Sequence, residues 1–135
     1  NLMITFVFLH MIRVFVYNKE IDMRSGFSHL HALVSNEMKS DLFAGNLFLF
    51  LGKNKRRVKI LLFDGSGLML IVKRLDRGNF MRVEDLMDTP EIEISDLKRL
   101  LDGVNLKVVF AHKKQIQSYL LHQIVLAASP IPFRM

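Results

Sequence analysis

Residues 46–74, NLFLFLGKNKRRVKILLFDGSGLMLIVKR, decide the fold of this chain. Three apolar, β-rich runs lie at 46–51, 57–64 and 68–74. The turn between the first two runs, GKNKR, is basic, and the turn before the third, DGSG, holds residues that tolerate positive φ. Short turns of this kind connect antiparallel neighbours. The stretch therefore predicts a meander of about three antiparallel central strands.

Before the meander, the apolar pattern predicts one strand and one helix. Residues 13–17 alternate weakly as a strand. Asp22 is placed to cap a helix that ends near Ser40. The inward positions of this helix follow the three-to-four spacing of one helical face: Phe27, Leu30, Leu33, Val34 and Met38.

After the meander, the pattern predicts a short strand and two helices. The strand is expected at 91–94, and Ser95 is expected to cap a helix over 96–102 that Gly103 ends. Residues 115–128 are expected to form the last helix, because the prolines that follow cannot continue it.

The central strands are apolar on both faces, which is typical of strands covered on both sides. The expected core positions are Leu47, Leu49, Ile60, Leu62 and Leu70. The predicted fold class is therefore α+β, a single domain in which helices pack on the meander. We expect an N-terminal extension over 1–12, the main domain over 13–106, and a C-terminal helix and tail over 107–135.

Composition excludes several classes of protein. The 135 residues are 50% hydrophobic and 24% charged, which is typical of one folded domain. The sequence has no cysteine, which excludes disulfides, thiolate metal sites and a cysteine nucleophile. The apolar run over 2–9 is too short to span a bilayer and lacks the features of a signal peptide, so we expect a strand or an ordered tail there and no membrane contact. A cytoplasmic protein is predicted.

Positive charge is concentrated in one internal segment. Residues 53–82 hold nine basic and two acidic residues, or +7, whereas the remainder holds ten basic and eleven acidic residues. An anion such as a nucleic-acid backbone would bind such a face, and the alternative is a basic surface that only keeps the protein soluble. Because the third strand returns to the end where the first turn lies, the candidate DNA-binding residues are Lys53, Lys55, Arg56, Arg57, Lys59, Lys73, Arg74 and Arg77.

Two arginines and their neighbours refine this interpretation. Arg56 and Arg57 are the better candidates for bidentate contacts. Alternation along the second strand puts Arg57 and Lys59 on one face of the sheet with Leu61. Arg24 lies apart from this group, where pairing with an acidic neighbour is favoured over positioning an anion.

No catalytic residue, metal site or cofactor is predicted. The spacing of the aspartates does not bring three carboxylates together, as metal-dependent phosphoryl transfer requires. The DGSG turn lacks the lysine of a phosphate-binding loop, so a hairpin turn is favoured. His29 and His31 lie on different faces of the expected helix, and His112 and His122 are about 15 Å apart, too far to share one ion.

Three blocks of residues resemble a known family. The first block holds IDMRSG (21–26), Leu30, Leu33, Val34 and DLFAGNLFLF (41–50); the second holds NKRRVKIL (54–61), DGSG (64–67), Lys73, Arg74, Leu75 and Phe80; the third holds Leu97, Leu100, Leu101, Asp102 and Gly103. In this order and spacing they resemble the TnpB-type accessory protein, the second open reading frame product, of IS-sixty-six-family insertion sequences. That protein is unrelated to the RNA-guided nuclease of the same name. The resemblance covers about residues 13–106, and the ends of the chain do not share it.

The resemblance implies a role in transposition beside a separate, larger transposase that carries the catalytic acidic residues. We therefore predict a non-catalytic accessory protein that binds DNA, the transposase, or both through the basic hairpin. The alternative is a protein-interaction module whose basic residues contact an acidic surface of the transposase or another partner without touching DNA. A small enzyme is a third and weaker interpretation.

Overall fold

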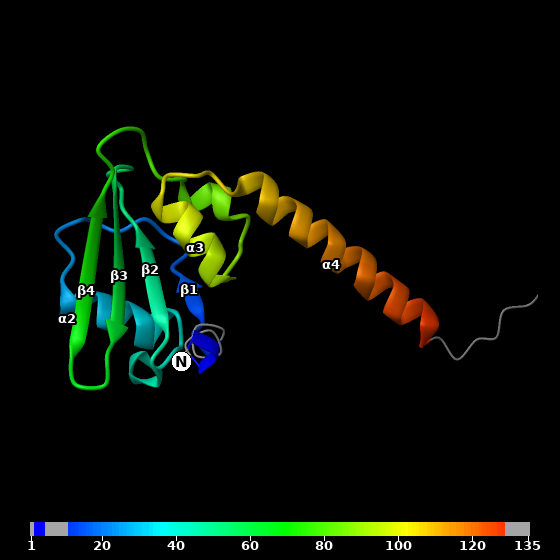
Figure 1. Ribbon diagram of the computed structural model, residues 1–135, viewed down its shortest axis with the longest axis horizontal. Coiled ribbons are helices and arrows are strands. Elements are labelled where there is room, and N and C mark those ends of the chain that lie inside the picture. Colours follow the sequence, from blue (N-terminus) through cyan, green and yellow to red (C-terminus); the bar gives the residue numbers. More distant parts are fainter. Residues whose placement is uncertain (1, 5–10, 129–135) are drawn as a thin grey trace, which may run out of the picture.

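The computed structural model describes residues 2–4 and 11–128, which form an open, mixed sheet with helices on both faces (Figure 1). The strands of these residues are β1 (Val14–Val16), β2 (Leu47–Leu51), β3 (Arg57–Phe63), β4 (Leu68–Arg74) and β5 (Glu91–Ile92), in the sheet order β4-β3-β2-β1-β5. The longer helices are α2 (Phe27–Ala32), which continues as a π-helical turn over Leu33–Glu37, α3 (Ile94–Leu101) and α4 (Lys107–Ala127). Short 3₁₀ helices lie at Leu42–Ala44 and Val83–Leu86.

The predicted meander is confirmed, but the sheet is larger than expected. β2, β3 and β4 are consecutive antiparallel neighbours. β1 pairs parallel to β2 on the other side, and β5 pairs antiparallel to β1, so the sheet has five strands and is mixed. The expectation of three antiparallel strands was incomplete because β1 reaches its place through a helical crossover, and such pairing depends on contacts far apart in the sequence.

Two helix starts differ from expectation. α2 begins after Gly26 rather than at Asp22. The Asp22 carboxylate instead accepts a hydrogen bond of 2.8 Å from the Arg24 backbone N–H, which closes a turn before the helix. α3 begins after Glu93 without a side-chain cap, so the predicted Ser95 cap was wrong, whereas Gly103, at φ +87°, ends this helix as expected.

The last helix begins eight residues earlier than expected, at Lys107 instead of Gln115. The Asn105 side chain accepts a 2.9 Å hydrogen bond from the Lys107 backbone N–H, and the flanking Leu106 and Phe110 are buried. A side-chain acceptor and two buried anchors therefore fix the start of α4. From there α4 runs outward, away from the sheet (Figure 1).

Both faces of the central strands are covered, as predicted. One cluster of buried residues lies between the sheet, α3 and the start of α4, and includes Leu49 and Ile60. The other lies between the sheet and α2 and includes Phe48 and Phe50. Three further positions expected in the core are only partly buried: Leu47, Leu62 and Leu70.

The two ends of the chain fall largely outside the described residues. Residues 2–4 are helical, and the rest of the run expected as a strand or ordered tail is not described. The same applies to the proline-containing tail after residue 128. In the described part of the chain, no helix is both long and apolar enough to cross a membrane.

Candidate nucleic-acid interface

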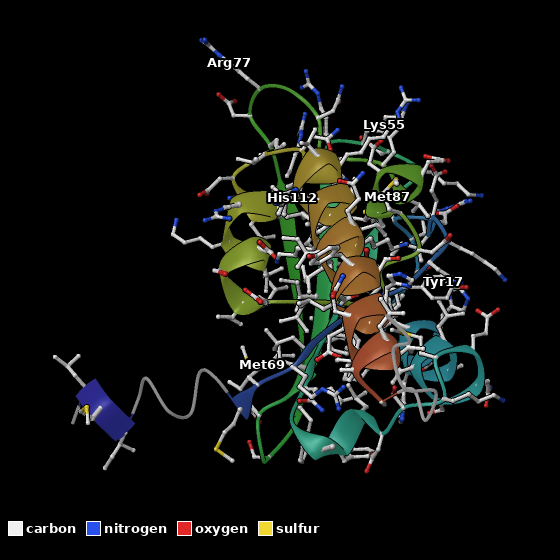
Figure 2. The ribbon with its side chains drawn as sticks, turned by 90° about the vertical axis from the view of Figure 1, so that its right-hand side faces the viewer. Tyr17, Lys55, Met69, Arg77, Met87 and His112 are labelled. Atoms are coloured by element: carbon white, nitrogen blue, oxygen red, sulfur yellow. The ribbon has the colours of Figure 1, made fainter. Side chains whose placement is uncertain are left out.

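Two basic segments meet at one end of the sheet. One is the turn between β2 and β3, and the other is the loop that follows β4. The backbone N–H of Leu75 donates to the Arg56 carbonyl at 2.8 Å, and that of Phe80 donates to the Lys55 carbonyl at 2.7 Å. These bonds hold the loop against the turn, and the labelled Lys55 and Arg77 lie at the same end of the molecule (Figure 2).

The β2–β3 turn is held by its own hydrogen bonds. Asn54 accepts from the Arg56 N–H through its side chain at 3.0 Å and from the Arg57 N–H through its backbone carbonyl at 3.1 Å. The Lys53 N–H donates to the Ile21 carbonyl at 2.9 Å, which ties the turn to the segment after β1. The basic side chains therefore extend from a fixed backbone.

Arg57 and Arg74 are direct cross-strand partners in the β3–β4 register. Like charges placed opposite one another in a sheet are destabilising. We define the basic end as the six residues Lys53, Lys55, Arg56, Arg57, Arg74 and Arg77. Within residues 11–128, none of these six side chains forms an ion pair within 4 Å.

Asp22 is close enough to Lys53 for the two charges to interact. Hydrogen bonds from Arg24 hold the pKa of the Asp22 carboxyl far below its usual range, and the charge of Lys53 adds a smaller effect in the same direction. The Arg24 guanidinium also forms an ion pair of 2.8 Å with Asp22, which confirms the pairing favoured for Arg24. Asp22 is thus engaged mainly by Arg24 rather than by the basic end.

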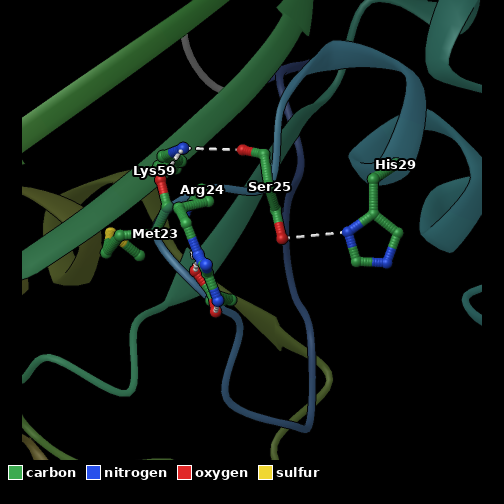
Figure 3. Close-up of polar contacts among 6 residues, drawn as sticks. Met23, Arg24, Ser25, His29 and Lys59 are labelled. Atoms are coloured by element: carbon green, nitrogen blue, oxygen red, sulfur yellow. Dashed lines mark hydrogen bonds and ion pairs between the residues drawn. The ribbon is translucent and has the colours of Figure 1, made fainter.

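Lys59 has a different position from the one that sequence reasoning gave it. It lies on the face of the sheet expected from alternation, but its side chain is buried there, with 7% of the residue exposed. The Lys59 Nζ donates to the carbonyl oxygens of Met23 at 2.7 Å and Ser25 at 2.6 Å (Figure 3). The loop between β1 and α2 crosses over β3 at this point, a long-range contact that strand alternation does not reveal. Lys59 fastens this loop and is not available to a phosphate.

Lys73 also lies apart from the basic end. It pairs with Val58 in the sheet, next to Arg74 but on the opposite face. Its Nζ lies 3.8 Å from Asp102 Oδ1, beyond the C-terminal end of α3. Of the eight predicted residues, the structure therefore brings six together, buries Lys59 and pairs Lys73 with a carboxylate.

The other polar groups singled out in the sequence have local partners. The Asp64 carboxylate accepts hydrogen bonds of 2.9 Å from the backbone N–H groups of Ser66 and Gly67, which lower its pKa and shape the turn before β4. This confirms the hairpin turn. His29 Nδ1 lies 2.9 Å from the Ser25 hydroxyl oxygen. Across the described residues, no group of three or more His, Asp or Glu side chains is arranged to hold a metal ion.

One buried charged residue was missed in the sequence. Asp96 on α3 is 1% exposed, and its Oδ2 accepts a 2.7 Å hydrogen bond from Lys113 on α4. Arg99 lies 3.6 Å from the other carboxylate oxygen, Oδ1. The pair formed by Asp96 and Lys113 joins α4 to α3. Its only sequence signal was an aspartate in the first turn of a helix, which usually indicates a favourable interaction with the helix dipole.

Two known proteins and one family model match large parts of this chain. The chain is 35% identical over 94 residues to the uncharacterized protein y4hO of Sinorhizobium fredii, a match that spans 70% of this chain and 82% of that protein. It is 34% identical over 70 residues to the uncharacterized protein y4jC of the same organism, which spans 52% of this chain and 60% of that protein. No solved structure matches the chain. The model of the family described as "IS66 Orf2 like protein" matches residues 12–111, so the chain belongs to this family of transposition accessory proteins.

Proposed function

We propose that this protein is a non-catalytic accessory factor of insertion-sequence transposition that binds duplex DNA in the cytoplasm through its basic end. The observation that carries the proposal is that two adjoining segments at one end of the sheet hold six basic residues with no ion-pair partner in the described part of the chain. Exposed basic residues that lack acidic partners remain available for phosphate groups.

The facing arginines support an anionic ligand more strongly than total charge does. Arg57 and Arg74 repel each other across two neighbouring strands, about 5 Å apart. A phosphate between them would replace that repulsion with two charge-assisted hydrogen-bonding contacts, and guanidinium groups suit this geometry. Because the sheet already fixes both strands, little backbone ordering is needed on binding.

Contacts of this kind recognise the DNA backbone rather than its sequence. Lysines such as Lys53 and Lys55 neutralise phosphates from flexible side chains. Arg56, which is exposed at the tip of the turn, is the residue best placed to reach a base edge in a groove. We therefore expect affinity for random duplex DNA.

Binding of the wild-type protein to a random duplex over a range of salt concentrations tests this proposal. If the basic end neutralises about four or five phosphates, log affinity should fall against log salt with a slope of roughly −4. Negligible affinity at low salt, or a slope near zero, would contradict DNA binding by this surface.

The alternative function is that of a protein-interaction module, in which the same unpaired basic end contacts an acidic surface of the transposase or another partner. In that case DNA affinity would be negligible from the start. Replacing the basic end would then weaken only the association with the transposase. Pull-down of the transposase and the salt titration on the same variants separate the two functions.

The accessory role also predicts that the purified protein does not cut DNA. The described residues hold no clustered carboxylates that could bind two metal ions for phosphoryl transfer. Incubation of supercoiled DNA with the protein and magnesium should leave it intact. Nicking that one Asp→Ala substitution abolishes would overturn the non-catalytic assignment.

A further inference from the structure

Helix α4 leaves the domain (Figure 1). Its outer part keeps an apolar surface that nothing in the described chain covers. Its anchored part ends near Lys113, which pairs with Asp96. Beyond that point, seven large apolar side chains are between 44% and 65% exposed: Ile116, Tyr119, Leu120, Leu121, Ile124, Val125 and Leu126. Surface helices normally hide such residues against a core.

The size of this surface is that of an interface rather than of an ordinary exposed patch. At about 200 Å² for a fully exposed large side chain, these exposures leave on the order of 700 Å² of mainly apolar surface. Each partner in a standard protein interface contributes about 800 Å². Taken around its whole circumference, the outer half of α4 thus presents nearly the share of one partner, and Leu121, Ile124 and Val125 on one face supply about half of it.

The charges of α4 indicate what covers it. Residues 115–127 contain no charged residue, so this surface meets no like-charge repulsion from an identical surface. Lys114 is exposed and forms no ion pair within residues 11–128, while the last turn of α4 has no basic residue to balance its C-terminal dipole. An identical helix packed antiparallel would place Lys114 beside that C-terminal end, where a cation is favourable. A parallel pair would bring the lysines of both copies together.

We infer that two copies of this chain associate through an antiparallel pair of α4 helices, with Leu121 near the two-fold axis. Leu121, Ile124 and Val125 are the most exposed aliphatic residues of the segment 115–127. Their spacing of three and four residues places them on one face of the helix. Tyr119 lies about 200° around the helix from Leu121. In this register Lys114 of one copy lies opposite Ala128 of the other.

This arrangement keeps the two domains at opposite ends of the paired helices, because α4 points away from the sheet (Figure 1). Two-fold pairing of identical surfaces is the commonest form of oligomer. The dimer would carry two basic ends, one per copy. Its formation does not require DNA, so dimerisation and DNA binding are tested separately.

Sedimentation equilibrium without DNA tests the inference. The wild-type protein should be a dimer at micromolar concentration. Leu121→Lys and Leu121→Glu should each raise the dissociation constant at least about 100-fold, because two like charges would be buried at the axis. Both variants should remain folded, since Leu121 is 62% exposed in a single copy, and circular dichroism checks this. Tyr119→Lys, on the opposite face, is the matched control and should leave the dimer intact.

A mixture of the two Leu121 variants tests the register. If Leu121 faces Leu121 of the second copy, the lysine and glutamate variants should form a heterodimer although each alone is monomeric. A wild-type protein that is still monomeric at about 100 μM overturns the inference. So does a monomer in which the apolar residues of α4 become buried only when the transposase binds. Charge variants that stay dimeric, or a mixture that stays monomeric, overturn the antiparallel pair centred on Leu121.

Discussion

The middle of strand β3 and its first residue use basic side chains for opposite purposes. Lys59, in the middle, is buried and donates to two backbone carbonyls of the loop before α2. Arg57, two residues earlier on the same face, is half-buried, has no ion-pair partner among the described residues and faces Arg74. The difference shows that the segment crossing over a strand, and not the strand pattern, determines whether a cation stabilises the fold or remains free to bind.

The largest expected effect concerns the core beneath this middle region. Leu49→Ala removes a side chain that is 0% exposed and should lower the free energy of unfolding by about 2–5 kcal/mol. Leu62→Ala, at a partly buried position, should cost less, about 1–2 kcal/mol. Urea denaturation measures both. Equal losses would show that the middle of the sheet is not packed more tightly than its margin.

A smaller loss is expected when the buried cation is removed. Lys59→Met would leave the carbonyls of Met23 and Ser25 without their donor and should cost about 1–3 kcal/mol. The slope of DNA affinity against salt should not change. Lys53→Met, in the exposed turn, is the matched control and should change stability by less than about 0.5 kcal/mol. A flatter DNA slope in Lys59→Met would place this residue in the interface after all.

The residue that follows β1, Tyr17, is buried and donates a hydrogen bond to Glu37 at the end of the π-helical turn. Burial, followed by the hydrogen bond to Glu37, raises the pKa of Tyr17 from 10.0 to about 12. Between these two values the folded state retains a proton that the unfolded state has lost, so stability should fall as the pH rises from about 10 to about 12. Urea denaturation at several alkaline pH values measures this loss. Tyr17→Phe should show a flatter dependence, and an unchanged dependence would mean that another group is responsible.

The smallest effect on stability is expected at the basic end itself. Arg74→Gln removes the repulsion with Arg57 and should raise stability by about 0.2–1 kcal/mol. The same change should flatten the DNA slope by about 1. Arg77→Gln, in the loop after β4, should flatten the slope without a gain in stability. Destabilisation by Arg74→Gln would show that the two arginines are not in conflict in the free protein.

The sequence predicted the parts of the fold that depend on local signals. The turns after Leu51 and Phe63 gave the meander and its basic tip, because turn residues and strand periodicity are short-range properties. The parallel place of β1 and the loop held by Lys59 depend on contacts more than 30 residues apart, which periodicity does not reveal. The early start of α4 was missed because Asn105, whose side chain accepts from the Lys107 N–H, lies before a run of β-branched and basic residues that is a weak helix signal.

In the candidate site too, the features that depend on local signals could be predicted and those that depend on long-range contacts could not. The six residues of the basic end were predicted because they flank turns whose strands are adjacent in the sequence. The partners of Lys59 and Lys73 were not predictable, since a carbonyl from the loop before α2 and a carboxylate beyond α3 reach them only in the folded chain. The apolar surface of α4 had no distinct sequence signal, because a buried helix would have the same composition.

The most direct test of DNA binding by the basic end measures the slope of log DNA affinity against log salt in two double variants. The first is Arg56→Ala/Arg57→Ala, and the second is a control that loses the same number of charges. Lys39→Ala/Lys98→Ala also removes two exposed positive charges, but from the residue that follows the C-cap of the π turn and from α3. The first variant should remain folded and flatten the slope by about 2, while the control should keep the wild-type slope of roughly −4. An unchanged slope in a folded Arg56→Ala/Arg57→Ala protein, or equal flattening in both variants, would contradict DNA binding by the basic end.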